Sequence, residues 1–505
     1  MALREAMTKY GKMIGAPSNY SMVSVFRGIP YAKPPVGELR WKAPQPLDVP
    51  DNPESVEPRV CHSFAKMAVQ EVFPLDMGPN KEGYCYPEPM SEDCLYLNVW
   101  TPAMKADEKL PVMMWVHGGA YIGGHSYSSN INGEIFGKQG VILVTVAYRL
   151  ASFGFLAHPE LSAESEQGVS GNYGTLDQIA ALRWVHENIA AFGGDPDCIT
   201  VFGQSAGAHS TQILASSPLS RAMVRRAILE SGASMGGCEL LPMRTLKEAE
   251  ELGGKMLEAI GVVSIEEARE IDAIDLLHRM TKAQLDMSGG NFLDLYFTPN
   301  IDGYVLEERL GQTVVKGSCS DVEYLLGHTD EGGLDFPMPF EAYPAWLDSF
   351  GNARAEIEQA LGIESQADLD KINPAGFRGA LITASSAFCE ARAANSGKPT
   401  FSYYFKRPLP GDDQGAAHSA EVFYVFNCLN FNWRPYVGTD YEIANALNAY
   451  WTNFAKTGDP NGDGLPTWEP FDPAAPARLH IEDGIAMEPV ESEPWQRALI
   501  DYAKR

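Results

Sequence analysis

Short apolar runs that alternate with amphipathic stretches restrict how this chain can fold more than any other feature. The runs with the length and residue types of buried strands are Cys94–Trp100, Val112–His117, Val141–Tyr148, Ile199–Gly203, Ala227–Leu229, Tyr324–Gly327 and Phe401–Phe405. Between them, Leu176–Ala190 carries apolar residues at 176, 179, 182, 185 and 189, which is helical spacing. Alternating strands and helices predict an α/β fold with a mostly parallel central sheet flanked by helices.

Two regions, residues 240–290 and 340–395, are rich in Glu, Ala, Leu and Arg and are expected to be helical. Both follow predicted strands, so we interpret them as insertions that roof the sheet within a single domain spanning residues 1–505. A separate second domain is the alternative.

Charge and hydropathy exclude several classes of partner. The formal net charge is −27, from 39 basic and 66 acidic residues, so we expect no nucleic-acid partner. No apolar run approaches the roughly 20 residues that cross a bilayer, so we expect no membrane partner. The N-terminus lacks the apolar core of a signal peptide, which makes the cytoplasm the default location. The alternative is a secreted protein whose signal peptide has been removed, since its N-terminus would look the same.

The strongest chemical signal is the run Gly203-Gln204-Ser205-Ala206-Gly207. It matches G-x-S-x-G, follows a predicted strand and precedes a helix of small residues, as a nucleophile elbow does. A turn sharp enough to present a serine hydroxyl needs small neighbours, and a helix N-terminus directs N–H groups at a developing oxyanion. Ser205 is therefore the candidate nucleophile, and a glycine-rich structural turn is the alternative.

A second glycine-rich loop, His117-Gly118-Gly119-Ala120, follows the predicted strand 112–117. It resembles the loop that completes an oxyanion hole. We expect the backbone N–H groups of Gly119, Ala120 and Ala206 to form that hole, with a plain loop as the alternative. We interpret His117 as a structural residue of the loop.

Longer motifs are distributed over nearly the whole chain. They lie at residues 26–32 with Pro34-Pro35, 91–99, 171–178, 192–196 and 458–461. Together they resemble the type-B carboxylesterases, the cholinesterase-like family of α/β-hydrolases, and its bacterial members in particular. Residues 240–290 and 340–395 match poorly. The resemblance implies an α/β-hydrolase fold and an esterase that acts on a small-molecule ester without a metal or organic cofactor. The oligomeric state stays open.

The acid and the histidine follow the nucleophile in the order Ser, acid, His in this fold. Asp330 and Glu331 both follow the predicted strand 324–327, and chemistry alone does not choose between them. The family pattern ends in Asp-Glu-Gly and uses the Glu, so the resemblance assigns Glu331 as the acid.

The family pattern of His, Glu and Tyr-Val-Phe appears after the predicted strand 401–405 and assigns His418 as the base. His209 and His328 are alternatives. His209 should point along its helix, away from the Ser205 hydroxyl. His328 precedes the acid, which breaks the expected order.

The resemblance also implies two ion pairs, Arg27–Glu92 and Arg149–Asp177, and a disulfide between Cys61 and Cys94. Cytoplasmic conditions would oppose that disulfide, and Cys85 in the same loop leaves the pairing open.

Substrate signals are fewer. Cholinesterases carry Glu before the nucleophile, where this chain has Gln204, and a Trp in the cysteine-bounded loop, where this chain has Tyr84 and Tyr86. A choline ester is therefore not expected. Candidates for an aromatic acyl pocket, with ordinary core as the alternative, are Tyr121, Phe292, Tyr296, Phe297 and Phe336. We expect a small neutral or aromatic ester, for instance a hydroxycinnamate.

Two other classes compete with this interpretation. Ser63-x-x-Lys66, Tyr96-x-Asn98 and Lys456-Thr457-Gly458 match β-lactamase-like patterns, but each is short enough to occur by chance. Some cholinesterase-like proteins are binding modules without catalysis, but these typically lack a member of the triad, and this chain keeps all three.

Overall fold

The computed structural model describes residues 1–71, 89–239, 241–291, 294–330 and 338–505. Glu331, Cys85, Phe292 and Phe336, together with Tyr84 and Tyr86, lie outside the described residues.

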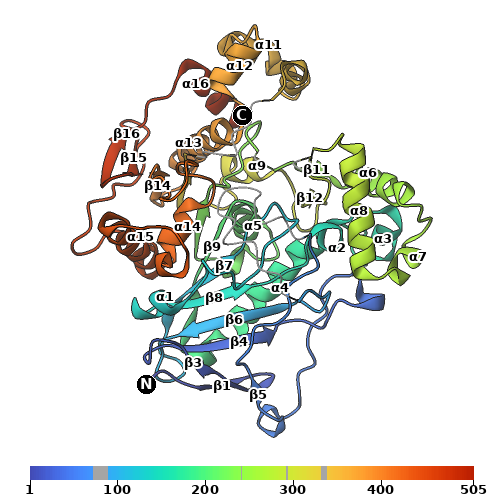
Figure 1. Ribbon diagram of the computed structural model, residues 1–505, viewed down its shortest axis with the longest axis vertical. Helices are drawn as coiled ribbons and strands as arrows, with labels where there is room; N and C mark the ends of the chain where they lie inside the picture. Colours follow the sequence, from blue (N-terminus) through green and yellow to red (C-terminus); the bar gives the residue numbers. More distant parts are fainter. Residues whose placement is uncertain (72–88, 240, 292–293, 331–337) are drawn as a thin grey trace.

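One sheet of 11 strands runs through the described part of the molecule (Figure 1). In spatial order it contains β16 (Ile485–Pro489), β15 (Ala477–Ile481), β14 (Thr400–Phe405), β13 (Glu323–Thr329), β10 (Arg226–Glu230), β9 (Gly194–Gln204), β7 (Leu110–Val116), β8 (Ile142–Val146), β6 (Tyr96–Thr101), β4 (Ser24–Pro30) and β3 (Ala16–Pro17). The strands from β8 to β15 pair in parallel. The outer strands pair antiparallel. Every predicted strand lies in this sheet, so the predicted mostly parallel sheet is confirmed.

Two smaller sheets lie outside the main one. The first contains β1 (Glu5–Thr8), β2 (Gly11–Ile14) and β5 (Arg59–Val60), and the second contains β11 (Arg244–Thr245) and β12 (Asn300–Ile301).

Helices cover both faces of the main sheet. They are α1 (Glu134–Lys138), α2 (Ala151–Phe155), α3 (Pro159–Glu164), α4 (Tyr173–Asn188), α5 (Ala206–Ser216), α6 (Leu246–Ala259), α7 (Ile265–Glu270), α8 (Ala273–Met287), α9 (Leu310–Val315), α10 (Tyr343–Asp348), α11 (Arg354–Leu361), α12 (Gln366–Ile372), α13 (Phe377–Asn395), α14 (Ala420–Val425), α15 (Gly438–Thr457) and α16 (Pro494–Ala503). Helices α4, α5 and α13 bury apolar side chains on one face, and α1, α14 and α15 do so on the other.

Strand β7 shows how the sheet separates its two cores. Val112, Met114 and Val116 point into the core beneath α4 and α5, whereas Met113 and Trp115 point into the core beneath α15. Because successive side chains of a strand point to opposite faces, an uninterrupted apolar run is what a strand covered on both faces requires.

Both predicted insertions are helical. Residues 240–290 contain α6, α7 and α8, and residues 340–395 contain α10 to α13 (Figure 1). Helix α13 does more than roof the sheet, because it packs directly on β13 and β14. We propose a single domain, since α13 also packs on the C-terminal helix α16 and one sheet contains strands from both ends of the chain.

One of the two implied ion pairs is confirmed, and the other forms with a different arginine. Arg149 Nη2 lies 2.7 Å from Asp177 Oδ1, and both side chains are buried. Glu92 pairs with Arg40, not with Arg27: Arg40 Nε and Nη2 each lie 2.7 Å from a Glu92 oxygen. Arg27 instead donates to the carbonyl oxygen of His62. The prediction failed because Arg40 also donates to backbone carbonyls from 268 to 271, which draws its guanidinium between Glu92 and the insertion.

The implied Cys61–Cys94 disulfide is not formed. Both residues are buried free thiols, and Cys61 Sγ lies 3.8 Å from the sulfur of Met13. Burial raises the pKa of the Cys61 thiol to about 11, so it stays protonated at neutral pH. The two cysteines act here as small apolar core residues.

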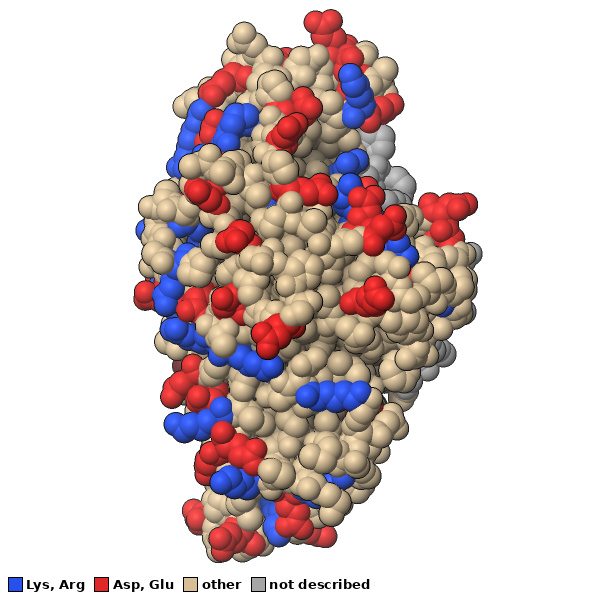
Figure 2. All heavy atoms as spheres, turned by 90° about the vertical axis from the view of Figure 1, so that its left-hand side faces the viewer, with Lys and Arg blue, Asp and Glu red and all other residues tan. Residues whose placement is uncertain are grey.

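The protein surface carries interspersed charges. On the face turned to the viewer in Figure 2, basic and acidic side chains alternate over a largely uncharged background. The net charge of −27 is thus not gathered into one patch of this face. Among the described residues, no helix is both long and apolar enough to cross a membrane.

Removing one partner of the Arg149–Asp177 pair should destabilise the fold. Asp177→Ala leaves a fully buried guanidinium without its carboxylate, and we expect a loss of about 3–5 kcal/mol in the free energy of unfolding. Asp275→Ala is the matched control, because it breaks an exposed pair with Arg279 within α8 and should cost roughly 0.5 kcal/mol or less. Urea unfolding monitored by fluorescence measures the free energy of unfolding of both variants. Equal losses would contradict a special contribution of the buried Arg149–Asp177 pair.

Candidate active site

Ser205 occupies a strained turn between β9 and α5. Its backbone has φ 57° and ψ −124°, a conformation that residues other than glycine rarely adopt. Its N–H donates to the carbonyl oxygen of Glu230 at 2.8 Å, so the end of the neighbouring strand β10 holds the turn. This is the geometry of the nucleophile elbow that the sequence predicts.

Two glycines allow the close contacts that build this turn. A Cβ on Gly207 would lie 2.0 Å from the carbonyl oxygen of Val116, so only glycine lets α5 start against β7. A Cβ on Gly118 would lie 3.2 Å from the Cβ of Ser205. The loop after β7 therefore packs directly on the Ser205 turn.

The predicted oxyanion donors lie around this turn. Gly119 and Ala120 belong to the loop that packs on Ser205, and Ala206 begins helix α5. Within the described part of the chain, their N–H groups donate to no other protein group. Ala120 has a φ of 54° and Tyr121 a φ of 63°, so the loop is held in an unusual backbone conformation.

His418 lies beside the nucleophile turn. The Nε2 atom of Gln204 is 3.1 Å from Nε2 of His418, and the imidazole is 9% exposed. The same amide nitrogen lies 3.5 Å from His418 Nδ1, so the imidazole ring lies directly against the residue that precedes Ser205.

The other candidate histidines are buried and hydrogen-bonded elsewhere. His117 stacks on Tyr148 with ring centroids 4.4 Å apart, and burial lowers its pKa to about 3. His209 Nδ1 lies 2.9 Å from the hydroxyl of Tyr121, and burial lowers its pKa to about 4. Both therefore remain neutral at pH 7, in keeping with structural roles.

The two alternatives near the end of β13 are also engaged. His328 Nδ1 lies 2.9 Å from the carbonyl oxygen of Thr329, and its Nε2 lies 3.1 Å from Arg478. Asp330 accepts from the hydroxyl of Tyr404 and pairs with Arg378 at 3.2 Å. The predicted acid Glu331 lies outside the described residues.

The predicted aromatic residues are placed only in part, since Phe292 and Phe336 lie outside the described residues. Tyr121 and Phe297 are core residues, 0% and 4% exposed, and Tyr121 turns inward to His209. Tyr296 is half-buried. Phe377, at the start of α13, is an aromatic residue beside the site: its ring lies edge-on to His418, with ring centroids 5.6 Å apart. Sequence reasoning missed it, because residues 340–395 match the family poorly.

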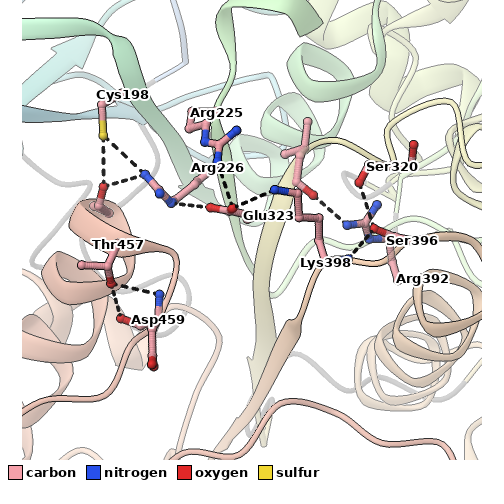
Figure 3. A network of polar contacts seen from close by, with 12 residues as sticks. Cys198, Arg225, Arg226, Ser320, Glu323, Arg392, Ser396, Lys398, Thr457 and Asp459 are labelled. Atoms are coloured by element: carbon pink, nitrogen blue, oxygen red, sulfur yellow. Dashed lines mark hydrogen bonds and ion pairs between the residues drawn. The ribbon is translucent and has the colours of Figure 1, made fainter.

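The Lys456 pattern lies apart from the other two β-lactamase-like patterns, because Ser63 and Asn98 both adjoin Gly28 of β4. Lys456-Thr457-Gly458 ends helix α15, where Gly458 has a φ of 82° and Thr457 bonds to Asp459 (Figure 3). The neighbouring Ala455 carbonyl accepts from Arg226 at the amino end of β10, whereas Ser205 is held at its carboxyl end. Asn98 lies within β6 and accepts from Gly28.

Comparison with known proteins identifies the family to which the chain is similar. The profile of the carboxylesterase family matches residues 3–358 and 378–494. The para-nitrobenzyl esterase of Bacillus subtilis is 32% identical over 97% of both chains. The fumonisin B1 esterase of Sphingopyxis macrogoltabida is 33% identical over 89% of this chain and 82% of its own. A solved para-nitrobenzyl esterase structure superposes with a TM-score of 0.84 at 30% identity, over 98% of this chain and 99% of its own.

The chain therefore belongs to the carboxylesterase family and has the α/β-hydrolase fold. Family and structure together make it a serine carboxylesterase.

Adding a methyl group at Gly207 should damage the Ser205 turn. Gly207→Ala forces α5 away from Val116, and we expect a loss of about 1–3 kcal/mol in stability together with reduced esterase activity. Gly254→Ala in α6 is the control, because no atom lies within 4 Å of its added Cβ. A glycine-to-alanine change in an open helix should stabilise by about 0.5–1 kcal/mol. Similar behaviour of the two variants in thermal unfolding would contradict the close contact.

Proposed function

We propose that this protein hydrolyses carboxylic esters through Ser205, His418 and Glu331 and an acyl-enzyme intermediate. The observation that carries the proposal is the strained Ser205 turn with His418 beside it, reached by the side chain of the adjacent Gln204. Strain of this kind persists only where the surrounding structure enforces it, and it concentrates at functional sites.

The proposed reaction follows from the groups around the turn. His418 takes the proton from Ser205, whose oxygen attacks the ester carbonyl carbon. Glu331 orients the imidazole and stabilises the imidazolium that forms. His418 then protonates the leaving alcohol, and it later activates the water that hydrolyses the acyl-enzyme.

The N–H groups of Gly119, Ala120 and Ala206 are proposed to bind the oxyanion of both tetrahedral intermediates. Their lack of other acceptors among the described residues supports this role, since such donors cost no reorganisation during the reaction. The loss of one donor typically reduces kcat by about 10²–10³.

Single substitutions in the triad should abolish turnover while leaving the fold intact. We expect Ser205→Ala and His418→Ala to lower kcat for p-nitrophenyl acetate on the order of 10⁴ or more. Glu331→Gln should cause a loss on the order of 10⁴, whereas Asp330→Asn, its matched control, should keep most activity. A serine-directed phosphonate should label the native protein and not Ser205→Ala. No labelling and no turnover on any ester would instead favour a binding module.

A small neutral or aromatic ester is the proposed substrate class, with hydroxycinnamoyl esters as the specific candidates. Phe377 offers an aromatic surface beside His418, and the net charge of −27 disfavours anionic substrates. The absence of a carboxylate at Gln204 argues against choline esters.

Aromatic acyl groups should depend on Phe377. We expect Phe377→Ala to lower kcat/KM for methyl ferulate about tenfold, because stacking on an aromatic acyl group is lost. The rate on p-nitrophenyl acetate should change far less. Equal native rates on acetyl and feruloyl esters, or equal losses in the variant, would contradict the aromatic preference.

A further inference from the structure

Two glutamates lie fully buried beneath the nucleophile turn, and the proposed reaction does not use their carboxyl groups. Glu230 is the last residue of β10 and pairs in register with Gln204 of β9. Its backbone carbonyl is the group that accepts from the N–H of Ser205. Glu421 lies in α14, three residues after His418. Both side chains are 0% exposed.

Neutral donors surround these carboxyl groups. Glu230 Oε1 accepts from the indole N–H of Trp451 at 2.7 Å. Glu421 Oε1 accepts from the hydroxyls of Ser231 at 3.2 Å and Tyr403 at 3.3 Å. The rings of Tyr403 and Trp451 lie 5.3 Å apart, so the aromatic donors of the two carboxyl groups are neighbours.

Glu230 has no basic partner in the described part of the chain. No ion pair includes it there, and its buried Oε2 receives no hydrogen bond from a described N–H or O–H group. A fully buried carboxylate in this position, next to a second acid, would be highly unfavourable.

We propose that Glu230 is a neutral carboxylic acid beside an ionised Glu421, and that these two residues position the loops that carry Ser205, the acid and His418. The inference rests on the proposed triad for its role in catalysis. The proton on Glu230 is inferred from the burial and contacts of the two carboxyl groups alone.

Ser231 connects the pair to the third loop. Its N–H donates to the carbonyl oxygen of Gly327, and its hydroxyl accepts from the N–H of Thr329 at 3.2 Å while donating to Glu421. Thr329 ends β13, which leads to Asp330 and the predicted acid. Ser231 has a φ of 51°, so its backbone too is held under strain at this junction.

The ionisation of the pair follows from its surroundings. Burial and then the charge of Glu421 raise the pKa of Glu230 well above its ordinary value. The groups that face the pair are Ser231, which directly follows β10, Tyr403 from β14, Trp451 from α15 and the nearby His418. Both causes favour the protonated form of Glu230 beside a charged Glu421.

Glu323 provides a matched contrast on the adjacent strand. It lies at the amino end of β13, 7% exposed, and pairs with Arg226 at 2.7 Å, Arg225 at 3.2 Å and Lys398 at 3.3 Å (Figure 3). Three cations surround the carboxyl group of Glu323, whereas Glu230 has no cation among the described residues. Glutamine is close in shape to a neutral glutamic acid and can replace one. Because it carries no negative charge, it cannot replace a carboxylate that pairs with cations.

Thermal unfolding and infrared spectroscopy test the proton on Glu230 without any reference to activity. We expect Glu230→Gln to unfold close to the native temperature and Glu323→Gln to unfold at a clearly lower one. The native protein at pH 7 should show the carbonyl stretching band of a protonated carboxylic acid, and Glu230→Gln should lack it. An unchanged band in Glu230→Gln, or equal destabilisation of the two variants, would overturn the proposal.

Kinetics test the positioning role. Glu230→Leu leaves Trp451 and Glu421 without their partner, and kcat should fall on the order of 10- to 100-fold. Glu230→Gln should restore most of that loss. Glu421→Gln removes the pair's negative charge, which makes the imidazolium of His418 less favourable, so the acid limb of kcat/KM should shift to lower pH.

In Glu230→Gln the charge remains on Glu421, so the acid limb should stay in place. Glu323→Gln should leave both kcat and the acid limb unchanged. A shift of the limb in Glu230→Gln but not in Glu421→Gln would overturn the proposed distribution of charge. If Ser205→Ala retains activity while the infrared result holds, the proposed triad is wrong and the proton on Glu230 is still supported.

Discussion

The contact between the start of α5 and the end of β7 is the constraint on which the rest of the site depends. Gly207 lies so close to the Val116 carbonyl that the chain must turn sharply after β9, and this turn forces Ser205 into a strained conformation. The hydrogen bond from Ser205 to Glu230 holds the turn from the other side. Since β7, β9 and β10 run parallel, their carboxyl ends meet at one edge, where the loops that carry chemistry gather.

The sheet accommodates buried acids in opposite ways at its two ends. At the amino ends of β10 and β13, Glu323 lies among three basic side chains (Figure 3). At the carboxyl end of β10, Glu230 lies among neutral donors and a second acid. The first arrangement stabilises a charge and joins strands, whereas the second suits a proton and lies directly beneath the Ser205 turn. The distinction follows from the partners alone, since both residues are glutamates in strands.

Local patterns predicted the strands of the sheet and the Ser205 turn, because apolar runs and G-x-S-x-G act over a few neighbouring residues. Contacts between distant segments were predicted less well. Glu92 pairs with Arg40, and Cys61 and Cys94 remain free thiols. Tyr121 points into the core, while Phe377 reaches His418 from a helix whose sequence resembles the family poorly. Each of these outcomes depends on how an insertion or loop packs, which no short motif encodes.

The sequence by itself determined the class of fold, the nucleophile candidate and the chain order in which acid and base must follow it. Strand periodicity and turn chemistry are local properties, so they can be read from consecutive residues. Only the tertiary structure decided which arginine meets Glu92, which aromatic ring faces His418, and that Glu230 and Glu421 share one buried environment. The physical reason is that burial and electrostatic partners arise from segments 190 and 221 residues apart in the chain, and these set the ionisation of a carboxyl group.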